Sequence, residues 1–147
     1  MRRTLRRPVR LSPGALVGVA ALSGPVRPED LQSGVTTLES FGFRVRLASN
    51  VLLREPLLGL AGTDDERLTG YLALVEDPEV EAILFARGGY GVTRVLHRLP
   101  ERLLAETAKL HCGFSDLTAL SAFLRERCGL VSLHGPMVAA DLAAPLD

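Results

Sequence analysis

One serine, set between an apolar strand pattern and a helical pattern, is the residue of this sequence best suited to chemistry. Ser115 lies in the run CGFSDL at residues 112–117. On a tight turn from strand to helix the hydroxyl is exposed, and the N–H groups that follow point to where an oxyanion would form. The helix dipole also favours negative charge there. Ser115 is therefore predicted to be a nucleophile; from the residues alone, a helix N-cap serine is the alternative.

A nucleophilic serine needs a general base, and the three histidines are the candidates. His97 lies in a helical pattern away from the turn. His111 precedes Ser115 on the same predicted strand and is too close along the chain to fold back onto its hydroxyl. His134 follows a strand, and we expect it at the rim of a ligand crevice. The sequence therefore supplies a nucleophile without a convincing base.

Strand and helix patterns alternate along the chain. Apolar or alternating runs predict strands at residues 16–21, 43–47, 80–86, 110–113 and 131–133. Periodic runs predict helices at residues 28–41, at 63–76, from 92 onward, after 100 and at 117–128. This alternation predicts an α/β fold of three layers, with a mainly parallel sheet and helices on both faces.

Local signals mark some helix boundaries and faces. Thr63 and Glu66 have the spacing of a capping box, and Gly42 is typical of a helix end. The helix at 28–41 is expected to bury one face, formed by Leu31, Val35, Leu38 and Phe41. The helix at 117–128 is expected to bury Leu117, Leu120, Phe123 and Leu124.

Four loops of turn-forming residues directly follow predicted strands: residues 23–25, 87–91, 113–116 and 134–136. In an open α/β sheet the ligand crevice lies at the carboxyl ends of the strands, so we expect these loops to meet at one edge. The glycines of the second loop do not fit a dinucleotide site, because Arg94 stands where the third glycine belongs. Tyr90 in that loop either lines a substrate pocket or covers the core.

Composition excludes several classes of protein. The chain has 147 residues, 47% of them hydrophobic and 23% charged, which fits about one globular domain. The formal net charge is zero, which argues against nucleic acid or an anionic membrane as partner. Two cysteines suit a reducing compartment, and no Cys–His spacing fits a zinc site. The basic, then apolar, N-terminus imitates a secretory signal, but prolines interrupt it, and no segment approaches the ~20 apolar residues that span a bilayer.

The sequence resembles the LD-carboxypeptidase family of serine peptidases, family S66, whose members include muramoyltetrapeptide carboxypeptidases and a microcin-immunity carboxypeptidase. The run RGGYG at 87–91 together with the serine–aspartate turn is specific, whereas either motif alone would be weak. The resemblance is carried by residues 13–14, 17–26, 42–45, 61–67, 86–91, 113–120 and 134–137.

The resemblance implies roles for particular residues. Ser115 would be the nucleophile, the Asp116 N–H one oxyanion donor, and the Gly88–Gly89 backbone the second, with Tyr90 near the substrate. The family reaction removes the terminal D-alanine of a peptidoglycan tetrapeptide and needs no cofactor or metal. In the family, the glutamate and histidine of the triad come from a C-terminal domain that is absent from this sequence, so the chain alone is expected to be inactive.

The expected organisation is a basic tail at 1–11 followed by the nucleophile-bearing domain at 12–147. The expected setting is cytoplasmic recycling of muropeptides, with a small peptide as substrate and neither nucleic acid nor membrane as partner. A microcin-immunity-type carboxypeptidase, a non-catalytic muropeptide-binding module and a truncated remnant are the alternatives. The apolar stretch at 137–146 is expected to be bare without a second domain, which predicts self-association, with a homodimer as one form.

Overall fold

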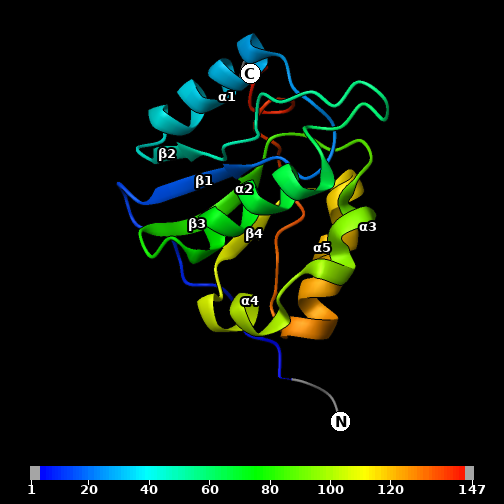
Figure 1. Ribbon diagram of the computed structural model, residues 1–147. Coiled ribbons are helices and arrows are strands. Elements are labelled where there is room, and N and C mark those ends of the chain that lie inside the picture. The colour runs from blue at the N-terminus through cyan, green and yellow to red at the C-terminus, as the bar shows by residue number, and fades with distance from the viewer. Residues whose placement is uncertain (1–3, 145–147) are drawn as a thin grey trace.

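The protein, seen here as a computed structural model, is described over residues 4–144. Four strands form one parallel sheet in the order β2-β1-β3-β4 (Figure 1). They are β1 (Leu16–Ala20), β2 (Arg44–Leu47), β3 (Val80–Phe85) and β4 (Leu110–Cys112). Leu16 of β1 pairs with Arg44 of β2, and Val17 pairs with Ala82 of β3. The predicted α/β fold with a parallel sheet is confirmed.

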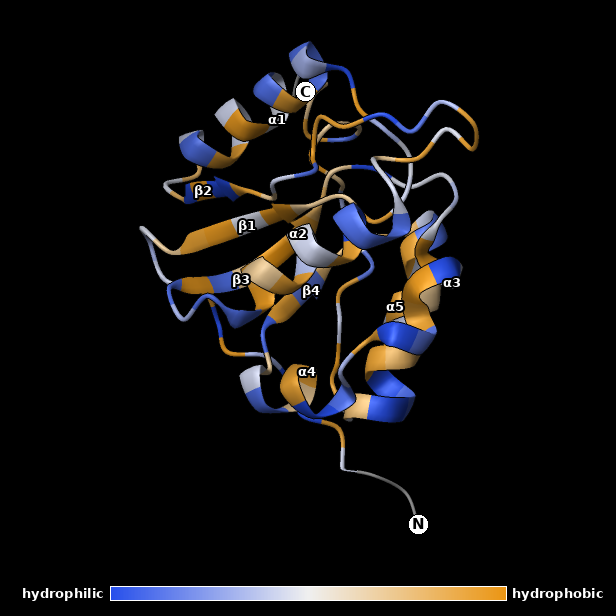
Figure 2. Cartoon of the chain, viewed as in Figure 1, coloured by the Kyte–Doolittle hydropathy of each residue, from blue (hydrophilic) through white to orange (hydrophobic). Residues whose placement is uncertain are grey.

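The helices cover both faces of this sheet. They are α1 (Pro28–Ser40), α2 (Asp64–Glu76), α3 (Val92–Val95), α4 (Glu101–Thr107) and α5 (Thr118–Phe123). Alternate residues of β1 enter different cores, because successive side chains of a strand point to opposite faces. Val17 and Val19 pack with α1, whereas Leu16 and Ala20 pack with α2 and α5. Figure 2 shows the apolar strands β1 and β3 enclosed between the helices.

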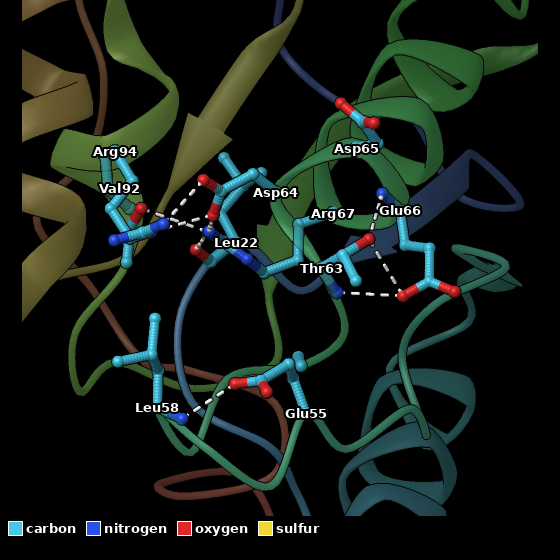
Figure 3. Close-up of polar contacts among 12 residues, drawn as sticks. Leu22, Glu55, Leu58, Thr63, Asp64, Asp65, Glu66, Arg67, Val92 and Arg94 are labelled. Carbon is cyan, nitrogen blue, oxygen red and sulfur yellow. Dashed lines mark hydrogen bonds and ion pairs between the residues drawn. The ribbon is translucent and has the colours of Figure 1, made fainter.

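The boundaries read from local signals hold at both helices. At α2, the Thr63 Oγ accepts from the Glu66 N–H at 3.2 Å, and the Glu66 carboxylate accepts from the Thr63 N–H at 2.8 Å (Figure 3). At the end of α1, Gly42 has a φ of +86°, and its N–H donates to Glu39 O. The expectation for Phe41 is wrong, because this residue is 53% exposed. The helix ends at Ser40, so the chain turns before Phe41 can follow the buried face.

The helix predicted at 117–128 is divided into three parts. A 3₁₀ turn (Ser115–Leu117) leads into α5, and a π-helical turn (Leu124–Cys128) follows it. Leu117, Leu120 and Leu124 are buried as predicted, and Phe123 is half-buried. The change of helical pitch lets these residues stay against the sheet although the helix begins directly at the strand end.

The last predicted strand, at 131–133, forms only isolated bridges. Leu130 pairs with Arg6, and Leu133 pairs with Cys112. Because the two bridges lead to different neighbours, the segment forms no continuous pairing with either. The Val131 N–H donates to Arg6 O at 3.0 Å, which ties part of the predicted tail at 1–11 to the domain. Residues 1–3 of that tail lie outside the described residues.

The apolar stretch expected to be bare is buried. Met137, Val138, Ala139 and Leu142 are each less than 9% exposed. The Val138 N–H donates to Phe85 O at 3.0 Å, and Thr37 Oγ1 of α1 donates to Leu142 O at 2.8 Å. This segment completes the core beneath α1, so the expected self-association, which depended on a bare apolar stretch, has no support from it. Residues 145–147 lie outside the described part. None of the helices described at 4–144 is long and apolar enough to cross a membrane.

The packing of α1 on this segment gives a first prediction. A Cβ at Gly34 would lie 1.8 Å from Val138 O, so an alanine there must separate the helix from the segment. We expect Gly34→Ala to lower the free energy of unfolding by about 1–3 kcal/mol, measured by urea denaturation. The neighbouring exposed change Ser33→Ala should leave stability unchanged or slightly higher, since alanine favours the helix. Equal stability of the two variants would contradict this packing.

Candidate functional site

The four loops that follow the strands meet at one edge of the sheet, as predicted. The Gly24 N–H donates to Gly88 O at 3.0 Å and joins the first two loops. A Cβ at Gly88 would lie 3.0 Å from Ser115 Oγ, which places the second loop against the third. The ring centroids of Phe114 and His134 are 5.5 Å apart, so the fourth loop touches the third.

Ser115 occupies a strained and exposed position in this arrangement. Its φ is +58°, in the left-handed region that costs a residue with a side chain about 1–3 kcal/mol. The residue is exposed and begins the 3₁₀ turn, directly after β4 and Gly113–Phe114. Strain of this kind persists only where surrounding contacts enforce it. Here the enforcing contacts come from the residue that follows the serine.

The carboxylate of Asp116 ties together three loops. Its Oδ2 accepts a hydrogen bond from Ser23 Oγ at 2.6 Å and another from the Val92 N–H at 3.0 Å. Ser23 is fully buried in the loop after β1, and Val92 begins α3 after the RGGYG loop. The sequence suggested only that Asp116 favours the helix dipole and offers its N–H. The structural role of the side chain was missed, because its partners are distant in the sequence.

Gly88 and Gly89 bring backbone close to the serine. Gly88 is buried and leaves no space for a side chain between itself and Ser115. Gly89 has a φ of +112°, a conformation that favours glycine. Gly88 O is used by Gly24, whereas within residues 4–144 the N–H groups of Gly88 and Gly89 have no hydrogen-bond acceptor. Two backbone donors are therefore available beside the hydroxyl.

A network of charged side chains contacts the RGGYG loop that contains Gly88 and Gly89 (Figure 3). The buried Arg67 donates to Leu22 O, to Gly91 O at 3.0 Å and to the Asp64 carboxylate. Arg94 makes a two-point contact with Asp64 at 2.8 and 2.9 Å. Hydrogen bonds from Arg94, then from Arg67, hold the pKa of Asp64 below its usual value. Asp64 therefore links α2 to α3 through Arg94, and Arg67 links α2 to the loops after β1 and β3.

Two sequence signals of this network were present but not interpreted. Asp64 lies inside the predicted capping box at 63–66, and Arg94 interrupts the glycine pattern of the neighbouring loop. Gly91, with a φ of +140°, has Arg67 Nη1 2.9 Å from where a Cβ would be. Tyr90 is 51% exposed. Tyr90 therefore lies at the surface of the loop and does not cover the core.

The structure separates the three histidines. His97 and His134 are exposed. His111 is buried, with its Nε2 2.8 Å from the Tyr71 hydroxyl and its Nδ1 3.0 Å from Lys109 O. Burial lowers the pKa of His111 to about 4. His111 is thus held in the core by hydrogen bonds on both ring nitrogens. Among residues 4–144, no three His, Cys, Asp or Glu side chains gather as a metal site would require.

Comparison with known proteins gives consistent matches. The family model of the LD-carboxypeptidase N-terminal domain, peptidase family S66, matches residues 17–135. A putative carboxypeptidase of Streptomyces coelicolor is 48% identical over 139 residues, which are 93% of this chain and 45% of that protein.

Two solved structures show the same fold. A MccF-like protein from Bacillus anthracis has a TM-score of 0.86 at 27% identity, over 94% of this chain and 42% of its own. A muramoyltetrapeptide carboxypeptidase from Oxalobacter formigenes has a TM-score of 0.76 at 32% identity, over 88% of this chain and 42% of its own. This chain therefore spans less than half the length of these relatives.

The backbone strain at Ser115 gives a second prediction. Glycine adopts a positive φ without steric cost, so Ser115→Gly should be more stable than Ser115→Ala by about 1 kcal/mol in urea unfolding. In α5 the order should reverse: Ser121→Gly should be less stable than Ser121→Ala by about 1 kcal/mol. The same order of glycine and alanine at both positions would show that Ser115 is not strained.

Burial of His111 gives a third prediction. Its pKa is about 4 in the folded protein and about 6.5 when unfolded, so between these values only the unfolded chain binds the proton. Stability should therefore fall as the pH is lowered from about 6.5 to 4, by up to about 1.4 kcal/mol per pH unit. His111→Gln, which does not titrate, should flatten this dependence in urea unfolding at several pH values. The exposed change His97→Gln is the control and should keep the wild-type slope.

Proposed function

Because this chain belongs to the LD-carboxypeptidase family, we propose that it is the nucleophile-bearing part of a serine carboxypeptidase acting on murein tetrapeptides. One observation carries the proposal: Ser115 is exposed at a strained turn, directly against a glycine backbone with free N–H groups. Exposed serines on such turns serve as nucleophiles in other hydrolases. The muramoyltetrapeptide carboxypeptidase of Oxalobacter formigenes supports the substrate class.

The proposed reaction is acyl transfer. Ser115 Oγ attacks the carbonyl carbon of the bond before the terminal D-alanine and forms an ester as that C–N bond breaks. The N–H groups of Gly89 and Asp116 stabilise the negative charge on the carbonyl oxygen. The hydroxyl proton passes through a general base to the leaving amine, and water then hydrolyses the ester.

The general base is proposed to come from outside residues 1–147. His111 is buried in the core with both ring nitrogens engaged. His97 is exposed, and the ring of His134 packs against Phe114. The resemblance supplies a glutamate and a histidine from a second domain, which agrees with the length of the relatives. The proposed setting is the cytoplasmic recycling of muropeptides.

A second candidate function is cleavage of a peptide antibiotic, as by a microcin-immunity carboxypeptidase. The TM-score of 0.86 to the MccF-like protein of Bacillus anthracis favours it. Both functions use the same serine and the same acyl transfer. They differ in the chemical group that leaves when the bond is cleaved. Comparison of a murein tetrapeptide with an aminoacyl sulfamoyl nucleoside as substrate separates them.

The nucleophile is tested in a fusion of this chain to the C-terminal half of the Streptomyces coelicolor relative. We expect the fusion to release D-alanine from a murein tetrapeptide, and Ser115→Ala to reduce kcat by at least about 10³-fold with folding intact. Ser33→Ala, an exposed serine on α1, is the control and should keep full activity. The chain alone should show no turnover near 1 per second, the lower end of the usual enzymatic range.

Each outcome decides between the hypotheses. Full activity of Ser115→Ala in the fusion would rule out Ser115 as nucleophile. Rapid turnover by the chain alone would mean that the base lies within residues 1–147. A fusion that binds the tetrapeptide but never cleaves it would favour the non-catalytic binding module.

A further inference from the structure

Two arginines beside the candidate site have no carboxylate partner. Arg54 Nη2 donates to Val26 O at 3.0 Å, and Arg87 Nη1 donates to Pro25 O at 3.1 Å. Within residues 4–144, neither guanidinium forms an ion pair. Their acceptors belong to consecutive residues, whose Cα atoms are ~3.8 Å apart. Two guanidinium groups without a carboxylate partner are therefore anchored to one short segment of the loop after β1.

Other arginines at this edge are neutralised. Arg27, in the same loop, makes a two-point contact with Asp30 at 2.8 and 2.9 Å. Arg67 and Arg94 share the carboxylate of Asp64. Glu55 follows Arg54 directly in the sequence, and its carboxylate accepts from the N–H groups of Leu57 and Leu58. Asp30 in the first turn of α1 is already occupied by Arg27. The unpaired charge thus belongs to Arg54 and Arg87.

The position of Arg87 connects this pair to Ser115. Arg87 directly precedes Gly88, which lies against Ser115 Oγ. Arg87 Nε is 3.6 Å from the Cβ position of Gly24, whose N–H is bound to Gly88 O. Arg87 lies on the loop after β3 and Arg54 on the loop after β2, and their hydrogen bonds to Pro25 O and Val26 O tie both side chains to the loop after β1.

We propose that Arg54 and Arg87 form a carboxylate clamp that binds a free carboxylate of the peptide substrate. The proposal rests on the proposed function, because a carboxypeptidase must distinguish a free chain end from an internal peptide bond. A guanidinium has five N–H donors, and each of these arginines gives one to a backbone carbonyl, so a fork of donors remains on each. Anchoring also reduces the side-chain freedom that is lost on binding.

The clamp is tested by direct binding to the chain, without catalysis. The probes are the peptide L-Ala-γ-D-Glu-L-Lys-D-Ala, the same peptide with a C-terminal amide, and a third with D-isoglutamine in place of D-glutamate. We expect one of the two neutralised peptides to bind about tenfold more weakly than the parent by calorimetry, because it lacks the bound carboxylate. Which one it is identifies the terminal or the internal carboxylate as the occupant.

Variants show whether the arginines cause this discrimination. Arg54→Ala and Arg87→Ala should each weaken binding of the parent peptide about tenfold. Neither variant should change binding of the neutralised peptide that lacks the bound carboxylate. Arg87→Lys should retain part of the affinity for the parent peptide. Arg27→Ala is the matched control, because Arg27 lies on the loop that carries both acceptors but is paired with Asp30, and this variant should change the binding of neither peptide. Equal binding of all three peptides, no binding at millimolar concentration, or equal losses for acid and amide would overturn the clamp.

The test separates this proposal from the proposed function. Discrimination by the chain together with a fusion that never releases D-alanine would retain the clamp and reject the carboxypeptidase. If the fusion releases D-alanine but the chain binds all three peptides equally, the carboxypeptidase is retained and the clamp is rejected.

Discussion

The carboxylate of Asp116 holds the candidate site together, since the conformation of Ser115 depends on what that carboxylate binds. It accepts from Ser23 Oγ in the loop after β1 and from the N–H of Val92 after the RGGYG loop. Both donors are on other strands' loops, so the turn after β4 is fixed from outside its own segment. A positive φ at a serine is unfavourable by itself, and these bonds are the contacts that offset it.

The parallel sheet makes this arrangement possible. Parallel strands place all their carboxyl ends at one edge, and the register of β1 with β3 brings Ala20 beside Phe85 at that edge. The residues that follow these two strands therefore start side by side. Hydrogen bonds then act over short distances: Gly24 to Gly88, Arg67 to Leu22 and Gly91, and Ala61 to Ser23. The site is assembled from loops, but each loop begins on a rigid strand.

Much of this fold could be predicted from local patterns. The four strands, the capping box at Thr63 and the loops at one edge follow from hydrophobic period and turn residues alone. The errors arose where partners far along the chain decide the outcome. Residues 131–133 alternate like a strand, but Arg6 and Cys112 draw them to different neighbours. The apolar segment after His134 looked bare in sequence, although α1 and the end of β3 bury it.

The site shows the same division between local and distant causes. Ser115 could be predicted as a nucleophile from its local strand-to-helix turn, and Gly88 and Gly89 from the family resemblance, whereas the roles of the Asp116 side chain and of the Asp64 network could not be predicted from the sequence. Charge gives the clearest case. A net charge of zero argues against a polyanion as general partner, but it does not show which arginines are neutralised. Only the pairing of Arg27 with Asp30, and of Arg67 and Arg94 with Asp64, shows that the charges on Arg54 and Arg87 remain. The positive charge that an anionic ligand could meet therefore depends on the local distribution of carboxylates, which the fold sets and the composition does not.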